Sequence, residues 1–266
     1  MPTVSDKLWL WGHPAGSYTG IWNLGGNSAI SVAAAAAYMG LRNVILVAFG
    51  GKPEPPLLPH AQELKHLDKL VWSIVGDSSS KRNDQQTDLD EVVALVPDIP
   101  PLAGAIMDDF FHKPNESGAV SRYSGEEIAG FADALHRANR PLDLWVVLYA
   151  HDLDLDVAPI LAECDVVTFW TWTAPELADL ERNMARVREL APGKRIVQGC
   201  YMWDFGTNQE IPQPALERQF ETGLEWLKAG VTDGMILLAS CICDLGIPGV
   251  EWARQWVARV GSQPLP

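Results

Sequence analysis

The chain has 266 residues, of which 47% are apolar and 20% are charged, enough to bury a core as one large domain or two small ones. A formal net charge of −14 disfavours nucleic acid and anionic membrane faces as partners. The apolar runs are too short to span a bilayer. Four cysteines are too few for a disulfide framework, so we expect reduced core thiols at Cys164, Cys200, Cys241 and Cys243.

The first residues, Met1–Lys7, lack the basic and then apolar pattern of a secretion signal. This favours the cytoplasm, although the mature form of an exported protein would look the same. The sequence does not indicate an oligomeric state.

Strand-like apolar runs alternate with helix-like amphipathic ones along the whole length. The expected strands are Leu8–Gly12, Asn43–Phe49, Leu70–Val75, Ala103–Phe110, Leu142–Ala150, Val166–Trp172, Arg195–Met202 and Gly234–Cys241. The expected helices are Ser28–Met39, Leu57–Asp68, Asp88–Leu95, Gly125–Ala138, Val157–Ala162, Ala174–Leu190, Ala215–Ala229 and Pro248–Val260.

Several helix boundaries have a physical cause. Ser124 with Glu127, and Thr173 with Glu176, have the spacing of capping boxes that begin helices. Glycine follows a helical run at three places, where a left-handed residue ends a helix without strain: Gly40, Gly193 and Gly230.

Eight such units predict an α/β fold, a (βα)8 TIM barrel formed by residues 1–266 as one catalytic domain. Continuous apolar strands such as Trp145–Leu148 indicate a parallel sheet covered on both faces. An open doubly wound sheet is the alternative. Trp11-Gly12-His13-Pro14 stands where the glycine-rich dinucleotide fingerprint would follow the first strand, and we expect no cofactor.

The carboxyl ends of barrel strands present side chains to substrate. The candidate substrate-binding residues there are Trp9, Trp11, His13, Tyr149, His151, Asp152, Trp170, Trp172, Tyr201, Trp203 and Asp244. Indoles stack on the apolar face of a pyranose ring, and carboxylates bind its hydroxyls, so an oligosaccharide or glycoside is the expected partner. The alternative is that these rings only pack the core, where we place the remaining tryptophans: Trp22, Trp72, Trp145, Trp226, Trp252 and Trp256.

The adjacent carboxyl groups of Asp108 and Asp109 follow the apolar run Gly104–Met107. An acid at a buried strand end takes part in chemistry or holds another group in place, and neighbouring side chains on a strand point opposite ways. We therefore expect different roles for the two. In the purely structural alternative, one caps a loop amide and the other pairs with His112 or Lys113.

The segment Gly104–Pro114 resembles the fourth-strand signature of glycoside-hydrolase-type barrels, including the alpha-amylase-like enzymes. In that signature a glycine begins the strand, an aspartate follows four positions on, and an aromatic pair and a proline come next. The resemblance implies a barrel that hydrolyses glycosidic bonds, with its nucleophile at Asp108. Ile106 stands in place of the amylase arginine, and Tyr149-Ala150-His151-Asp152 in place of the fifth-strand glutamate.

Glycoside hydrolysis needs a second carboxyl group that carries a proton. Asp204 ranks first because it follows a strand beside Trp203 and Phe205, where loss of solvent would raise its pKa. The further candidates are Asp152, Asp244, Glu116 and Glu210.

Two other functions stay open. A metal-dependent hydrolase or isomerase could use His13, Asp109, His151 and Asp244 as ligands. A carbohydrate-binding barrel without catalysis would keep the indoles and would not need the paired aspartates.

Overall fold

The computed structural model describes residues 1–83 and 86–266. Its strands follow the order β1 to β8 and close into a barrel. The strands are β1 (Leu8–Gly12), β2 (Asn43–Leu46), β3 (Lys69–Val75), β4 (Leu102–Met107), β5 (Asp143–Tyr149), β6 (Val166–Trp170), β7 (Arg195–Tyr201) and β8 (Gly234–Leu238). The predicted (βα)8 TIM barrel is confirmed, and the open sheet was the wrong alternative.

Helices alternate with these strands. They are α1 (Val32–Met39), α2 (Leu58–Gln62), α3 (Leu89–Ala94), α4 (Gly125–His136), α5 (Ala158–Glu163), α6 (Leu180–Leu190), α7 (Gln213–Ala229) and α8 (Pro248–Val260). The strands are almost wholly buried, as the continuous apolar runs predict. Among the described residues, no helix combines the length and hydropathy needed to cross a bilayer.

Several predicted strands are too long at their carboxyl ends. The strand beginning at Asn43 ends at Leu46, and the strand beginning at Gly234 ends at Leu238. The apolar sequence continues after the last hydrogen-bonded residue of each strand because the residues that follow are also buried. The 3₁₀ turn Ser240–Ile242 after β8 is an example. Hydropathy therefore marks burial here, and not the end of the hydrogen-bonded strand.

Local hydrogen bonds also explain two differences at the helices. The first helix begins at Val32, because the Ser31 side chain caps it and Asp244 binds the amides of Ala29 and Ile30. The second helix ends at Gln62, and tight turns continue to Leu67.

Of the two predicted capping boxes, the one at Ser124 is present and the one at Thr173 is half present. The Thr173 amide donates to Glu176 (3.0 Å), but a 3₁₀ segment, Pro175–Asp179, precedes α6. Gly40 and Gly230 end α1 and α7 in the predicted left-handed conformation.

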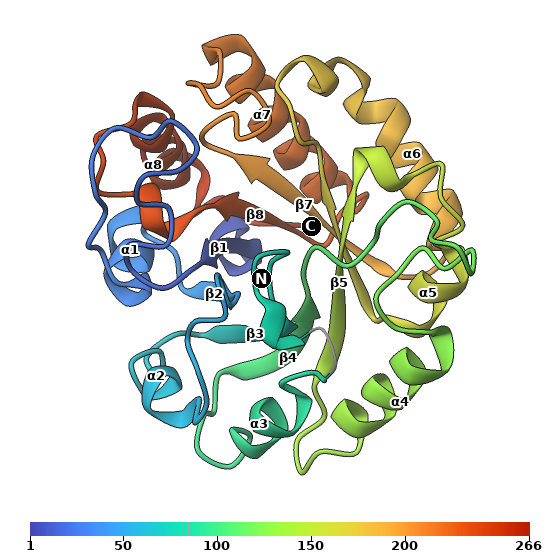
Figure 1. The fold of residues 1–266 in the computed structure, drawn as a ribbon. Coiled ribbons are helices and arrows are strands. Elements are labelled where there is room, and N and C mark those ends of the chain that lie inside the picture. The colour runs from blue at the N-terminus through green and yellow to red at the C-terminus, as the bar shows by residue number, and fades with distance from the viewer. Residues whose placement is uncertain (84–85) are drawn as a thin grey trace. The chain divides into compact units, whose positions relative to one another are not determined.

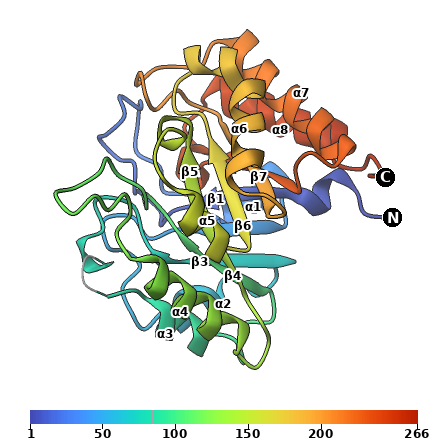
Figure 2. The same cartoon turned by 90° about the vertical axis from the view of Figure 1, so that its right-hand side faces the viewer.

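The chain divides into two compact units. The first unit comprises residues 1–44, 170–180 and 197–266. Within it β8 pairs in parallel with β1 and β7. The two termini lie side by side, since the Leu265 amide donates to the Pro2 carbonyl (2.9 Å) (Figure 2).

The second unit comprises residues 45–169 and 181–196. Strand β4 lies between β3 and β5, with Ala105 opposite Trp72 and Leu144. Helices α3 and α4 lie on the outer side of these strands (Figure 1).

All four cysteines are free and buried, and burial raises the pKa of their thiols, so they stay protonated at neutral pH.

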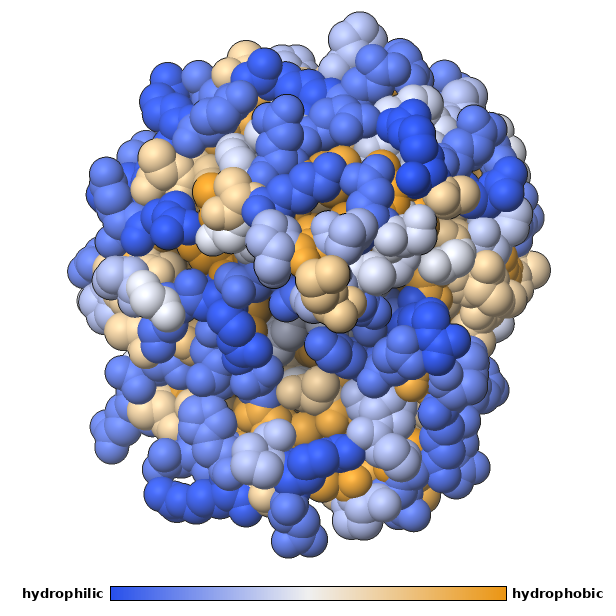
Figure 3. All heavy atoms as spheres, turned by 180° about the vertical axis from the view of Figure 1, so that it is seen from behind, coloured by the Kyte–Doolittle hydropathy of each residue, from blue (hydrophilic) through white to orange (hydrophobic). Residues whose placement is uncertain are grey.

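Hydrophilic residues cover most of the face in Figure 3, with apolar residues between them.

Candidate functional site

Four carboxyl groups of the second unit lie near one another at the carboxyl ends of its strands, and we call them the aspartate cluster: Asp77, Asp108, Asp109 and Asp152. Asp77 follows β3, the adjacent pair follows β4, and Asp152 follows β5. Asp77 and Asp109 both act on Asp108 electrostatically, and Asp109 acts on Asp152. Parallel strands bring these side chains together because their carboxyl ends share one edge of the sheet.

Asp108 is a buried carboxyl group of the aspartate cluster. Burial raises its pKa well above the usual value, and the nearby charges of Asp109 and Asp77 raise it further. The backbone of Asp109 and the charge of Arg122 act in the opposite direction. One oxygen, Oδ1, is buried without a hydrogen-bond partner. Burial thus favours the protonated form of Asp108, and its Oδ1 has a hydrogen-bonding capacity that none of the described residues uses.

Asp109 has a different environment. Its Oδ1 accepts a hydrogen bond from the Tyr149 hydroxyl (2.9 Å), and its Oδ2 accepts one from the Ser78 amide (2.9 Å). Its backbone has a φ of 42°, which a non-glycine residue rarely adopts. Asp109 is half-buried and Asp108 is 4% exposed. The strained backbone thus turns one carboxylate of the pair toward the surface, which is common at functional sites.

Tyr149, His151 and Asp152 lie together at the end of β5, and Tyr149 links them to Asp109. The His151 ring stacks on the Tyr149 ring, with 5.1 Å between centroids and an interplanar angle of 8°. Asp152 accepts the Tyr149 amide (3.1 Å), and burial raises the pKa of Asp152. These contacts fix the tyrosine whose hydroxyl orients Asp109.

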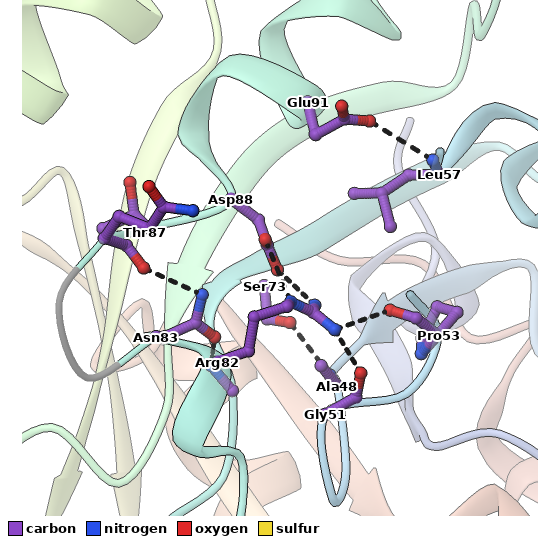
Figure 4. A network of polar contacts seen from close by, with 12 residues as sticks. Ala48, Gly51, Pro53, Leu57, Ser73, Arg82, Asn83, Thr87, Asp88 and Glu91 are labelled. Atoms are coloured by element: carbon purple, nitrogen blue, oxygen red, sulfur yellow. Dashed lines mark hydrogen bonds and ion pairs between the residues drawn. The ribbon is translucent and has the colours of Figure 1, made fainter. Parts of the chain in front are cut away.

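A polar network holds the loops after β2 and β3 (Figure 4). Arg82 forms an ion pair with Asp88 and donates to the carbonyls of Gly51 and Pro53. Asp77 in turn accepts the Gly50 amide (3.0 Å) and the Ser79 amide (3.1 Å). Asp77 therefore orders loops beside the pair, a role that its place at the end of β3 could have suggested.

Seven rings of the first unit form a second group, the aromatic cluster: Trp11, Tyr18, Trp22, Trp170, Trp172, Tyr201 and Phe205. Trp170 contacts Trp11 and Tyr201, both at 5.2 Å between centroids. Trp172 lies 5.8 Å from Tyr201 and 6.0 Å from Trp22. Most contacts are edge-to-face or tilted, an arrangement that aromatic rings prefer.

The aromatic cluster has a buried part and an accessible part. Trp11, Trp170 and Tyr201 are buried, whereas Trp22 and Trp172 are half-buried. The prediction that six further tryptophans belong to the core is confirmed for Trp72, Trp145 and Trp256, which are buried. It is wrong for the half-buried Trp22, Trp226 and Trp252, and the loop after β1 carries Trp22 onto Trp172. A tryptophan within a long loop after a strand was the signal that could have placed it correctly.

The other predicted site residues of the first unit mainly form hydrogen bonds within the protein. His13 Nε2 accepts the Trp11 indole N–H (3.0 Å), and the Trp203 indole donates to the Trp22 carbonyl (3.2 Å). Trp9 is buried within β1. Asp244 is exposed and binds the loop amides described above. Although burial raises the pKa of Asp244, hydrogen bonds from residues 28–30 outweigh that effect and lower it.

Asp204 is buried at the end of β7 in the first unit. Its Oδ2 accepts the Ala174 amide (3.0 Å), and its Oδ1 accepts the Thr207 amide (3.0 Å). Both oxygens therefore bind the backbone of loops.

The four residues of the metal alternative are divided between the two units. Across residues 1–83 and 86–266, no three His, Cys, Asp or Glu side chains form a group that could hold a metal ion.

Comparisons with solved structures show the fold. A xylanase and alpha-amylase inhibitor protein, XAIP-I, in complex with trehalose is 14% identical, with a TM-score of 0.60 over 96% of this chain and 98% of that one. The catalytic domain of a chitinase from Pyrococcus furiosus is 10% identical, with a TM-score of 0.53 over 86% and 83%. The GH113 beta-mannanase AaManA from Alicyclobacillus acidocaldarius is 11% identical, with a TM-score of 0.52 over 98% of both chains.

Neither a protein-family model nor a curated protein matches the sequence. The chain therefore shares the TIM-barrel fold with these three proteins.

Proposed function

We propose that this chain hydrolyses glycosidic bonds, with Asp108 and Asp109 as its catalytic carboxyl groups. The observation that carries the proposal is the contrast within this pair. Asp108 is buried and its pKa is raised, whereas the half-buried Asp109 accepts hydrogen bonds from a hydroxyl and an amide. Glycosidases need such a division between a protonated and a charged carboxyl group.

In this mechanism the two aspartates act on opposite ends of the breaking bond. Asp109 provides negative charge to the sugar carbon as it becomes oxocarbenium-like, and Tyr149 holds that carboxylate in place. Asp108 provides the proton that the leaving oxygen takes up as the glycosidic bond breaks. A water molecule then adds to the sugar carbon and returns a proton to the Asp108 carboxylate. The resemblance placed the nucleophile at Asp108, but the raised pKa of Asp108 favours the role of proton donor.

The aromatic cluster supports sugar as the substrate class. Trp22 and Trp172 are half-buried, so part of each ring is accessible for stacking on a pyranose. Among the neighbours in fold, XAIP-I was solved with trehalose and AaManA with ManMIm. We assign sugar binding to the aromatic cluster, and we assign Asp204 to holding its loops, since both carboxylate oxygens bind amides.

Hydrolysis rates of the matched variants Asp108→Asn, Asp109→Asn and Asp204→Asn test the assignment, after a screen of aryl glycosides identifies a substrate. Asp109→Asn should lose several orders of magnitude in kcat with every leaving group. Asp108→Asn should lose about 10²–10⁴-fold with a poor leaving group and much less with a dinitrophenyl group, which needs no protonation. Wild-type turnover in Asp109→Asn would refute the mechanism.

A barrel that binds sugars without cleaving them is the second candidate. The Oδ1 atom of Asp108 is buried, and Asp204 is fully occupied by backbone amides. XAIP-I, which has the same fold, is named as an inhibitor of xylanase and alpha-amylase and was solved with a bound sugar, trehalose. Measurable binding of oligosaccharides, with no turnover of any glycoside in the screen, would favour this candidate.

A further inference from the structure

The turn after β3 connects the side chain of Asp77 to that of Asp109. Oδ2 of Asp77 accepts hydrogen bonds from the Ser79 amide (3.1 Å) and the Ser79 hydroxyl (2.5 Å). The Ser80 amide donates to the Asp77 carbonyl (2.9 Å) and completes the turn. Ser78 lies within this turn, and its amide donates to Oδ2 of Asp109 (2.9 Å). The Asp77 side chain therefore fixes the peptide group that binds Asp109.

Asp77 itself is anchored to the loop after β2. Its amide donates to the Ala48 carbonyl (3.1 Å), and its Oδ1 accepts the Gly50 amide (3.0 Å). The preceding Gly76 packs so closely that a Cβ there would lie 2.7 Å from the Ala48 carbonyl oxygen. Both oxygens of the buried Asp77 carboxylate thus bind the protein, so its position is fixed before any ligand arrives.

Asp77 also acts on Asp108, through its charge. Burial raises the pKa of Asp108, and the negative charges of Asp109 and then Asp77 raise it further. The backbone of Asp109 and the positive charge of Arg122 oppose this effect. The charge of Asp77 therefore favours the protonated form of Asp108, which is the form that a proton donor needs.

We infer that Asp77 is a positioning residue for both carboxyl groups of the pair. It holds the Ser78 amide on Asp109, and it keeps a fixed negative charge near Asp108. The inference rests on the proposed function for the roles of the pair in hydrolysis. Asp77 touches neither the sugar nor the breaking bond in this scheme, and it acts only through its two neighbours.

NMR spectroscopy of the whole chain tests the inference without any substrate. The carboxyl carbon signal of Asp108, identified by its loss in Asp108→Asn, gives the pH midpoint of its titration. In Asp77→Asn this midpoint should move to lower pH, because a nearby negative charge has been removed. The amide proton signal of Ser78 should move upfield in the same variant, because the hydrogen bond to Asp109 weakens once the turn loosens.

Matched variants separate the charge of Asp77 from the geometry of the turn. Ser79→Ala keeps that charge and removes one hydrogen bond to Oδ2. It should therefore move the Ser78 signal and leave the Asp108 midpoint in place. Asp133→Asn removes a charge at an exposed position on α4 and should change neither signal. If Asp77→Asn does not fold, Asp77→Ser replaces it, since a serine hydroxyl can still accept the Ser79 amide.

The pH profile of kcat is the readout that a purely structural role would not move, once a substrate is known. Asp77→Asn should lower kcat about tenfold or more with little change in KM, because the carboxyl groups lose their alignment and the aromatic cluster does not change. The basic limb of the profile should move to lower pH, because the proton donor loses its proton more easily. Ser79→Ala should lower kcat without moving that limb.

The inference is overturned if the charge-removing variant of Asp77 leaves the Asp108 midpoint or the Ser78 signal at its wild-type position. A raised KM with unchanged kcat, or an unmoved basic limb, would also overturn it. Failure of the proposed function has a different signature, since no glycoside would be hydrolysed or Asp109→Asn would keep wild-type turnover. The NMR signals depend on neither outcome.

Discussion

The aspartate cluster and the aromatic cluster differ in the kind of group that they gather. In the aromatic cluster every ring contacts another ring, the nearby Asp204 uses both oxygens on backbone amides, and Trp22 has a buried indole nitrogen without a partner and a left-handed backbone. In the aspartate cluster, Asp108 has a buried oxygen without a partner, and Asp109 has a left-handed backbone. Unsatisfied polar groups and backbone strain concentrate where a protein acts on a ligand. We therefore keep the proposal that the carboxyl groups carry the chemistry and that the rings bind sugar, because only the aspartate cluster offers groups that can hold or transfer a proton.

The buried and accessible rings of the aromatic cluster should respond differently to truncation. Trp170 is 1% exposed, and it lies so close over Gly199 that a Cβ there would be 2.0 Å from its ring. Trp170→Ala leaves a large cavity, so we expect a loss of about 3–5 kcal/mol in the free energy of unfolding, measured with urea. A loss below about 1 kcal/mol would show that Trp170 is not a core residue.

Two of the buried aspartates, Asp204 and Asp108, should respond in opposite directions to replacement by asparagine. Asp204→Asn replaces one acceptor with an amide group that would face a backbone N–H. We expect the free energy of unfolding to fall by about 2–3 kcal/mol, because an acceptor for a loop amide is lost. Unchanged stability would contradict the assignment of Asp204 to holding the loops.

Asp108→Asn should instead stabilise the protein at neutral pH. The folded state keeps Asp108 protonated at pH values where the unfolded chain has already released the proton. The wild type therefore loses stability as the pH rises from the unfolded pKa to the raised folded pKa. Each unit between these two values corresponds to about 1.4 kcal/mol.

The measurement is urea unfolding of wild type and Asp108→Asn across this pH window. The advantage of the variant should grow with pH, since the amide does not titrate. An advantage independent of pH would show that Asp108 is not the titrating group.

The strand and helix pattern was predictable because burial and periodicity are local properties of the sequence. Helix α8 and strand β1 have the predicted bounds. The sequence also ranked Asp108 and Asp109 together, since adjacent carboxyl groups after an apolar run are unusual. It could not distinguish their environments, because the raised pKa of Asp108 results mainly from burial between packed strands, and further from the charges of Asp109 and of Asp77, which follows another strand.

Loop residues were the part that sequence reasoning could not place. Arg122 reaches Asp108 only because the loop after β4 pairs with itself, and no periodic pattern marks that pairing. Trp22 is similar, since its contacts with Trp172 and Phe205 depend on the path of the loop after β1. Residues that act across long loops need coordinates to be found.

The smallest expected effect lies at the accessible edge of the aromatic cluster. Trp172→Ala removes a half-buried ring, so it should weaken oligosaccharide binding by about 1 kcal/mol if that ring stacks on sugar. Its effect on the free energy of unfolding should be much smaller than that of Trp170→Ala, because the Trp172 ring buries less apolar surface in the folded protein. Trp226→Ala is the matched control, since Trp226 is also half-buried but lies on α7, apart from the rings described above. Equal weakening in both variants would point to a general loss of structure, whereas weakening in Trp172→Ala alone would assign sugar binding to the aromatic cluster.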